Sequence, residues 1–209
     1  MSSTLASLWD WRRQVADLYA GVRTEPNPQR AWLHWRRVRD GLFRDHAQTP
    51  IEPGAGFAGL DFFPYDPALR FHVKQSPISG GVEETFVAGA DGELRMLPFA
   101  RTQGLQEALG GELTFYWLLG YGGGVFLPFA DATSGRETYG AGRYLLDTIK
   151  GADLGATPDG RVLLDFNFAY NPSCAYSARY ACPLSPAANR LPAAVRAGER
   201  TPAQSGCAG

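Results

Sequence analysis

The sequence predicts a mainly β protein of the α+β class. We expect an antiparallel β-meander, closed as a barrel or folded as a sandwich, with two N-terminal helices packed against it. Helical periodicity of apolar residues is confined to the first fifty residues. From residue 57 onward, short runs rich in β-branched and aromatic residues alternate with glycine-containing turns. No helix-length apolar period follows residue 57, which argues against a parallel α/β sheet.

Two helices are predicted before residue 50. In the first, apolar residues recur at steps of three and four between residues 8 and 22. Asn27 and Pro28 supply the N-cap and the first-turn proline of the second helix, which ends before Pro50. Four arginines lie off the apolar stripe of this helix, and nearby acidic residues favour a solvated face over a phosphate-binding patch. These are Arg30, Arg36, Arg37 and Arg39.

Six to eight short strands are predicted after the helices. Phe71 and Val73 alternate with polar neighbours, which is the pattern of a half-buried antiparallel strand. Sequences such as 90–92 (ADG), 120–124 (GYGGG) and 158–160 (PDG) are typical of the turns between strands. The predicted strands are Phe57–Phe63, Leu69–Gln75, Glu84–Val87, Glu93–Pro98, Glu112–Leu119, Val125–Phe129, Thr138–Leu146 and Arg161–Phe166.

Size and charge limit the classes of function. The chain has 209 residues, which suits one domain over residues 1–200, followed by a disordered tail over 201–209. The formal net charge is −1, whereas nucleic-acid-binding proteins normally carry a basic excess, so we predict no nucleic-acid partner. The sequence has no apolar run of membrane-spanning length and no signal-peptide pattern. We therefore predict a cytoplasmic protein without a membrane partner; a homodimer is compatible with the sequence.

The three cysteines are Cys174, Cys182 and Cys207. Their odd number argues against a disulfide framework, and their spacing is not that of zinc ligands, so no metal site is predicted. We expect Cys174 and Cys182 to lie close together because the Asn171-Pro172 turn makes the intervening segment compact. Cys174 is then a buried structural thiol, a nucleophile or half of a reversible pair. His46 is the candidate base for such a nucleophile.

Two segments in the last third of the chain are dense in polar residues, 131–144 and 164–176. Arg143 lies between glycines and apolar residues of a predicted strand, where a guanidinium needs a carboxylate or a ligand anion. A salt bridge to Asp131 or Asp165 and an anionic ligand both satisfy this need. Strand alternation puts Asp165 and Asn167 on one face, opposite apolar neighbours. The side chains predicted to converge are Arg143, Asp165, Asn167 and Asn171, with Asp131 or Tyr139.

These segments also carry a family resemblance. The runs 122–144 (GGGVFLPFADATSGRETYGAGRY), 165–176 (DFNFAYNPSCAY), 182–191 (CPLSPAANRL) and 197–199 (AGE) resemble a prokaryotic family known only as domain of unknown function 1684. The resemblance implies that the polar segments form one site in a protein of bacterial type, and it names no substrate. The family pattern has glycine at Ala141, proline at Ser185 and glutamate at Ala188. If that glutamate is catalytic in relatives, its absence here predicts either a binder or a protein whose activity has drifted.

Three interpretations of the polar residues are open. The first is a small-molecule enzyme that carries out cofactor-independent hydrolysis or lyase-type acid–base chemistry on an anionic or carbonyl-bearing substrate. The second is a noncatalytic β-barrel in which the same groups bind a small ligand. The third is a purely structural network. For the enzyme, the predicted catalytic residues are Asp165, Tyr170 and Cys174, and the predicted substrate-binding residues are Asp131, Tyr139, Arg143, Asn167 and Asn171.

Overall fold

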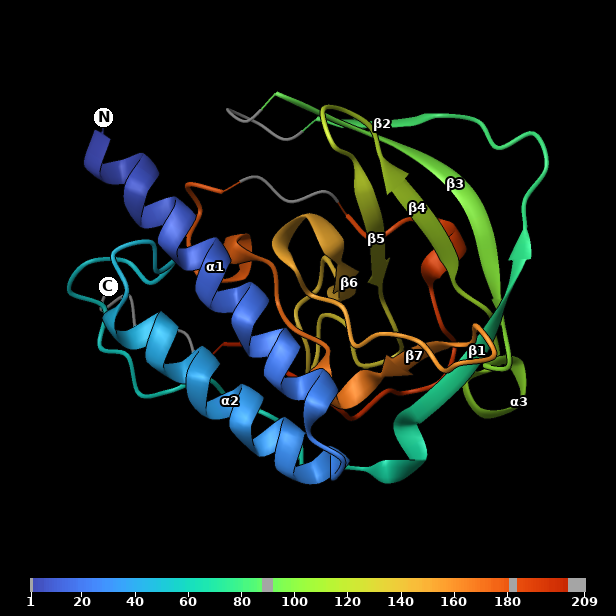
Figure 1. Cartoon of the computed structure of the whole chain (residues 1–209), viewed down its shortest axis with the longest axis horizontal. Helices are drawn as coiled ribbons and strands as arrows, with labels where there is room; N and C mark the ends of the chain where they lie inside the picture. The colour runs from blue at the N-terminus through green and yellow to red at the C-terminus, as the bar shows by residue number, and fades with distance from the viewer. Residues whose placement is uncertain (1, 88–91, 181–183, 203–209) are drawn as a thin grey trace.

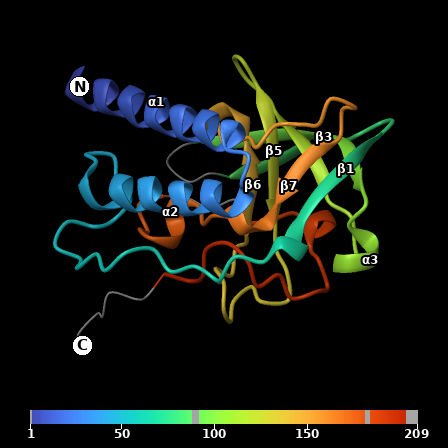
Figure 2. The ribbon, with the colours of Figure 1, turned by 60° about the horizontal axis from the view of Figure 1, so that its bottom comes forward.

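The computed structural model of the chain describes residues 2–87, 92–180 and 184–202. Seven strands form one antiparallel sheet that curls into a nearly closed barrel, and two long helices lie across its outer face (Figures 1 and 2). The predicted α+β class and the two packed helices are confirmed, and of the two alternatives for the sheet the barrel is the one observed. Among the described residues, no helix combines the length and apolar character needed to cross a membrane.

The helices follow the predicted caps. Helix α1 (Ser2–Thr24) and helix α2 (Pro28–Asp45) are joined by a short turn. The Asn27 side chain accepts a hydrogen bond from the backbone N–H of Arg30 at 2.9 Å, and Pro28 opens the first turn of α2. The apolar stripe of α2 buries Trp32 and Trp35 against the barrel. Helix packing, more than intrinsic propensity, therefore holds α2 in place.

Strands β3 to β6 form a meander of sequential neighbours, whereas β1 lies between β3 and β7. Their spatial order is β6-β5-β4-β3-β1-β7, and β2 pairs with β3. Tyr144 and Tyr170 exchange two backbone hydrogen bonds of 2.9 and 3.1 Å, which link β6 to the segment after β7 and draw the barrel closed. The strands are β1 (Arg70–Pro77), β2 (Glu84–Val87), β3 (Glu93–Gln103), β4 (Thr114–Leu118), β5 (Gly124–Phe129), β6 (Arg143–Asp147) and β7 (Val162–Asp165).

Three local predictions differ from the structure. Residues 57–63 form no named strand and make only one bridge, between Phe62 and Glu199. Strand β6 begins at Arg143 because the chain turns at Gly142, which has a φ of 99°. Strand β7 ends at Asp165, whose carboxylate caps a 3₁₀ turn over Phe166–Phe168, so Asn167 is not a strand residue. The predicted 90–92 turn lies mostly outside the described residues.

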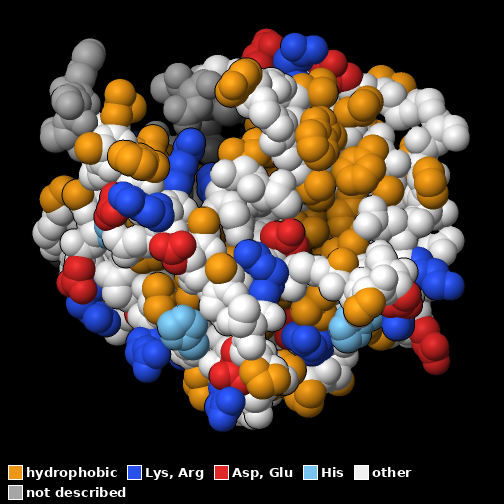
Figure 3. Space-filling model, viewed as in Figure 1, with side chains coloured by type: hydrophobic (Ala, Val, Ile, Leu, Met, Phe, Trp, Pro, Cys, Tyr) orange, Lys and Arg blue, Asp and Glu red, His pale blue; other side chains and the backbone are white. Residues whose placement is uncertain are grey.

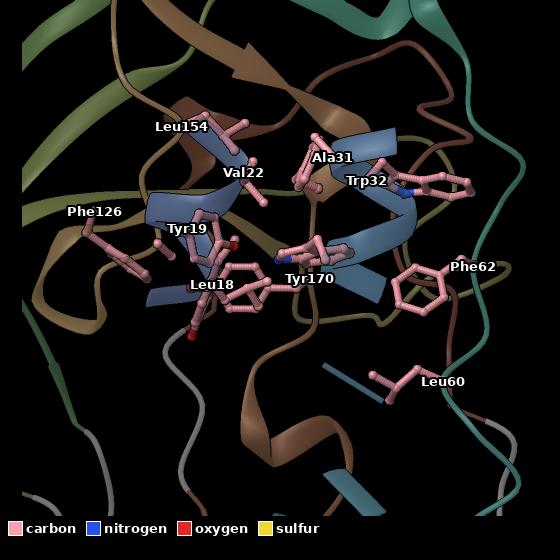
Figure 4. Packing of buried hydrophobic residues seen from close by; sticks show 14 of the residues in the cluster. Leu18, Tyr19, Val22, Ala31, Trp32, Leu60, Phe62, Phe126, Leu154 and Tyr170 are labelled. Carbon is pink, nitrogen blue, oxygen red and sulfur yellow. The ribbon is translucent and has the colours of Figure 1, made fainter. Parts of the chain in front are cut away.

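The barrel wall is apolar on both faces. On β4, Phe115 points to the lumen cluster, and its neighbour Tyr116 packs in the cluster beneath the helices. The same alternation places Phe126 of β5 under the helices and Leu127 in the lumen. Figure 4 shows Phe126 gathered with side chains of both helices and with Tyr170. Because the helices cover the outer face, the central strands are almost continuously apolar.

Candidate ligand-binding site

Arg143 is the centre of a buried hydrogen-bond network. Its side chain is 1% exposed, and its Nη2 donates to the Asp131 carboxylate at 2.7 Å and to the Val195 carbonyl at 2.9 Å. Its Nη1 donates to the carbonyls of Ala197 and Glu199. Burial lowers the pKa of Arg143, and the Asp131 carboxylate partly offsets that effect. Four of the five guanidinium protons are therefore used within the protein.

This network fastens the C-terminal segment to the barrel. The other Asp131 oxygen accepts hydrogen bonds from the backbone N–H and the hydroxyl of Thr133 and from the backbone N–H of Val195. Arg143 thus bridges β6 to three carbonyls of residues 195–199, a strap that crosses the end of the barrel. The arrangement gives partners to both oxygens of the buried carboxylate and to four of the five guanidinium protons, and a buried ion pair is tolerated only when it is hydrogen-bonded in this way.

Asp165 and Asn167 belong to a second network. One Asp165 oxygen accepts from the backbone and side-chain nitrogens of Asn167 at 3.0 and 2.7 Å, and the other accepts from Arg70 at 3.1 Å. The Asn167 amide also exchanges two hydrogen bonds with the backbone of Asp66, and the Trp32 indole donates to the Asn167 carbonyl. Burial raises the pKa of Asp165, although Asn167 and Arg70 act to lower it. These contacts anchor α2 and the 66–70 segment to β7.

A third network joins α2 to the strap. Glu199 is fully buried and accepts hydrogen bonds from Arg39, from the backbone N–H of Asn171 at 2.6 Å and from the Tyr176 hydroxyl at 2.9 Å. The Arg39 guanidinium also stacks over the rings of Phe43 and Tyr170, at 4.5 and 4.9 Å from their centroids. Burial acts to lower the pKa of Arg39, but the Glu199 carboxylate outweighs it, and the pKa is raised.

A cavity of about 450 Å³ lies between the helices and the outer face of the barrel. Its volume is within the range of about 300–1,000 Å³ that is usual for small-molecule sites. Seven aromatic side chains form part of the walls, and Arg39 and Asn171 bring the third network to its surface. The aromatic lining residues are Trp11, Tyr19, Phe43, Phe126, Tyr144, Tyr170 and Tyr180.

Of the charged side chains that line the cavity, Arg39 pairs with Glu199 and Lys150 pairs with Asp147, and Arg12 lines it as well. Asp147 is buried and pairs with Lys150 at 2.9 Å. Burial raises the pKa values of Tyr19, Tyr144 and Tyr170, so their hydroxyls stay protonated at neutral pH. Among the described residues, no group of three or more histidine, cysteine or acidic side chains is placed to hold a metal ion. The lining therefore offers hydrogen-bond donors and aromatic surface.

The structure separates the residues that the sequence suggested as one site. Asp131 pairs with Arg143, and Asp165 pairs with Asn167, in two networks away from the cavity lining. Tyr139 is half-buried, and its hydroxyl donates to the Cys174 carbonyl at 3.4 Å. The predicted residues that line the cavity are Tyr170, Asn171 and Cys174.

The structure shows the surroundings of Cys174 and His46, the predicted nucleophile and its candidate base. Cys174 is disulfide-bonded, so in this form it offers no thiolate. Cys182 and Cys207 lie outside the described residues. His46 caps the end of α2, where its Nε2 lies 3.2 Å from Asp10 and its Nδ1 accepts from the backbone N–H of Gln48. It therefore ties α2 to α1.

The sequence reasoning missed Arg39 and Glu199. Arg39 was assigned to a solvated helix face, and that assignment is wrong for it: its side chain is only 13% exposed. The signal was present, because Arg39 lies seven residues after Trp32 and four before Phe43, on the apolar stripe itself. Glu199 carried no periodic signal, since the strap has no regular secondary structure.

Comparison with known proteins assigns the family. The model of the family described as "Protein of unknown function (DUF1684)" matches residues 55–200. The chain belongs to the DUF1684 family. It is also similar to the uncharacterized protein from gene locus rrnAC0354 of Haloarcula marismortui, whose structure was solved in solution by NMR. The two chains share 31% identity over 83% of this chain and 94% of that one, with a TM-score of 0.57. No curated protein matches the chain.

The DUF1684 match begins after the two helices. The barrel, the strap and both polar segments lie within the matched span, whereas α1 and α2 precede it. The cavity is lined by residues from both parts, including Trp11 and Val15 from α1 and Phe126 and Tyr170 from the matched span. The resemblance deduced from the polar segments is thus confirmed, and it covers one wall of the cavity.

Proposed function

We propose that this protein binds a small, largely apolar molecule in the cavity between the helices and the barrel, without chemically converting it. The observation that carries the proposal is the cavity itself: about 450 Å³ of space between the helices and the barrel, with seven aromatic side chains in its lining. Side chains in protein interiors normally leave few voids larger than a water molecule. A void of this size lined by apolar groups with a few polar ones is typical of a ligand site.

The polar residues support binding over catalysis. Asp165, proposed as a general base, has its oxygens occupied by Asn167 and Arg70 and is not among the cavity-lining residues. Tyr170 does line the cavity, but burial raises its pKa, which makes it a poor proton donor at neutral pH. The disulfide removes the nucleophilic form of Cys174. The polar motifs then hold the cavity walls together, which combines the binding interpretation with the structural one.

Filling the cavity tests this function. Val15 lines the cavity from α1 and is partly buried, whereas Asp17 is exposed on the same helix. We expect Val15→Trp to occupy the space and Asp17→Trp, the matched control, to leave it open. The probe is the fluorescent dye 1-anilinonaphthalene-8-sulfonate, titrated into the wild type and both variants, with thermal melts to verify folding.

Wild type and Asp17→Trp should bind the dye saturably with similar Kd, and Val15→Trp should bind it at least about tenfold more weakly, a difference of about 1.4 kcal/mol. Native mass spectrometry of the purified wild type should also show a small-molecule adduct that Val15→Trp lacks. Equal dye affinity in the two tryptophan variants, with no adduct in any sample, would show that the cavity is not a ligand site.

A further inference from the structure

We infer that the ligand is an anion, an apolar body that carries one carboxylate, and that this carboxylate pairs with Arg12 at the edge of the cavity. This inference rests on the proposed function and assigns the ligand class of the same site. The charges in the cavity lining carry it, because each of them except Arg12 has a partner of opposite charge among the described residues.

Two of the cations in the lining are already compensated by the protein. In the part of the chain that the structure describes, the charged side chains lining the cavity are Arg12, Arg39, Asp147 and Lys150. The Lys150 ammonium lies 2.9 Å from the Asp147 carboxylate, and the Arg39 guanidinium forms an ion pair with the buried Glu199. Each pair is neutral as a whole, so the two pairs together add no net charge to the cavity.

Arg12 contributes a positive charge without such compensation. Its side chain is exposed and makes no hydrogen bond or ion pair with any described residue. The acidic residues of α1 are Asp10 and Asp17, and neither lines the cavity. The Asp10 carboxylate instead accepts a hydrogen bond from Gln14 of the same helix at 2.7 Å. The lining therefore has an excess of one positive charge, and this charge lies at Arg12.

Arg12 and Lys150 come from two walls that meet at one edge of the cavity. Gly151, which follows Lys150, packs closely on α1, since a Cβ placed at Gly151 would lie 3.1 Å from the Cα of Ala16. Arg12 lies one helical turn before Ala16, on the same side of α1. An anion that approaches this edge meets exposed cations from both walls, whereas the Asp147 side chain is only 4% exposed.

Arg39 is the other guanidinium of the lining, but an anion fits it less well. Its Nε and Nη2 donate to the Glu199 carboxylate, so a ligand carboxylate at Nη1 would face a second carboxylate across the same group. Like charges that are shielded from water repel each other strongly. The ligand carboxylate therefore belongs at Arg12, and a neutral part of the ligand lies against Arg39.

The lining next to Arg12 is apolar and suits the body of the ligand. Trp11 and Val15 line the cavity from α1, and Leu118 and Phe126 line it from β4 and β5. Burial of apolar surface against these walls supplies most of the binding free energy. A guanidinium holds a carboxylate through two parallel hydrogen bonds, which fixes the orientation of the ligand at its charged end.

A matched pair of ligands tests the inference without altering the protein. The probes are cinnamate and cinnamamide, which have nearly the same shape and differ in charge, and binding to the full chain is measured by NMR titration. We expect cinnamate to bind about fivefold more tightly at low ionic strength. Salt shortens the Debye length from about 30 Å at about 0.01 M to about 3 Å at about 1 M, so this preference should disappear at high salt.

Removing the charge of Arg12 tests the assignment to this residue. The control is Arg13→Gln, because Arg13 is exposed on the same helix, pairs with Asp10 and is not among the residues that line the cavity. Both variants lose one positive charge, so the overall charge of the protein changes equally. In Arg12→Gln, cinnamate should bind like cinnamamide, whereas Arg13→Gln should keep the preference for cinnamate. Thermal melts verify that both variants fold.

The outcomes separate the inference from the proposed function. If cinnamamide binds as tightly as cinnamate, or if the two glutamine variants weaken cinnamate equally, the inference is overturned and the proposed function stands. The same holds if neither probe binds while the naphthalene dye still distinguishes Val15→Trp from Asp17→Trp. If the dye fails to distinguish those variants as well, the proposed function falls and takes the inference with it.

Discussion

The lumen of the barrel and the space beneath the helices are lined by the same strands but are filled to different degrees. In the lumen, rings such as Phe129 and Phe166 meet edge to face at 5.1 Å, and a hollow of about 180 Å³ lies beside Phe115 and Leu146. Beneath the helices, about 450 Å³ stays empty. Strands around a closed barrel point their side chains at one another, whereas a helix touches a curved sheet only along its apolar stripe.

The two regions differ in their roles: the lumen holds the fold together, and the space beneath the helices is the proposed ligand site. The lumen and the strap that crosses it are closed by internally satisfied groups, such as the Arg143–Asp131 pair. The space beneath the helices is lined by Arg39, whose Nη1 makes no hydrogen bond to any of the described residues. The hollow surrounded by hydrophobic side chains in Figure 3 lies over the strands of the barrel, away from the helices, which carry charges of both signs. Changes in the two regions should therefore have different consequences.

The largest effect on stability is expected from Arg143→Met. The substitution leaves the Asp131 carboxylate buried without its cation and releases the carbonyls of the strap. Breaking a buried pair in this way typically costs about 3–5 kcal/mol of unfolding free energy. Urea denaturation followed by circular dichroism measures it.

The control is Arg196→Met, which breaks the exposed pair between Arg196 and Glu137 and should cost less than about 1 kcal/mol. If Arg143→Met is no more destabilising than Arg196→Met, yet abolishes dye binding, then Arg143 serves the ligand and the division between the two regions is wrong.

Two phenylalanines of β5 test the difference in packing between the lumen and the cavity. Phe129 faces the packed lumen and is fully buried, and Phe126 faces the cavity. We expect Phe129→Ala to cost about 3–5 kcal/mol, since it creates a new void in dense packing. Phe126→Ala should cost about 1–2 kcal/mol less, because a ring beside an existing void has fewer contacts to lose.

Urea denaturation of both variants gives the difference, and the dye titration should show a change only for Phe126→Ala. Equal losses of stability would mean that the cavity is closed in solution and that Phe126 is packed as densely as Phe129.

A smaller, pH-dependent effect is expected at the end of the lumen. The Glu112 carboxylate accepts hydrogen bonds from the backbone N–H groups of residues 104–106 and from the Thr102 hydroxyl. Burial acts to raise the pKa of Glu112, but these donors outweigh it, and the pKa lies below its ordinary value of 4.5. The stabilisation is therefore complete above about pH 4.5 and is lost as the pH falls through the lower pKa of the folded state.

We expect Glu112→Gln to cost about 1–2 kcal/mol at pH 7 and much less near pH 3. Denaturation curves at both pH values test this, with Glu107→Gln on exposed α3 (Gln106–Leu109) as the control. A cost that does not change with pH would show that the carboxylate charge contributes nothing to the cap.

Local chemistry made the elements predictable. The Asn27-Pro28 cap, the turn at 120–124 and the alternation along β1 each depend on neighbours within a few residues, and each specified its element. The need of Arg143 for an anionic partner was also open to deduction, because a buried guanidinium must be paired, but the choice of Asp131 over Asp165 or a ligand was not. What lay beyond local reasoning was the grouping of the polar residues into three separate networks.

The class of fold and the family therefore follow from the sequence alone, which also singled out Asp131, Arg143 and Asp165, all of them buried in the structure. The position of the cavity depends on tertiary packing, because α1, α2 and the outer face of the barrel form it together. Tertiary packing also sets the partner of Arg39, since Glu199 lies 160 residues further along the chain. Contacts at such separations leave no periodic signal in the sequence, and they exist only once the helices pack on the barrel.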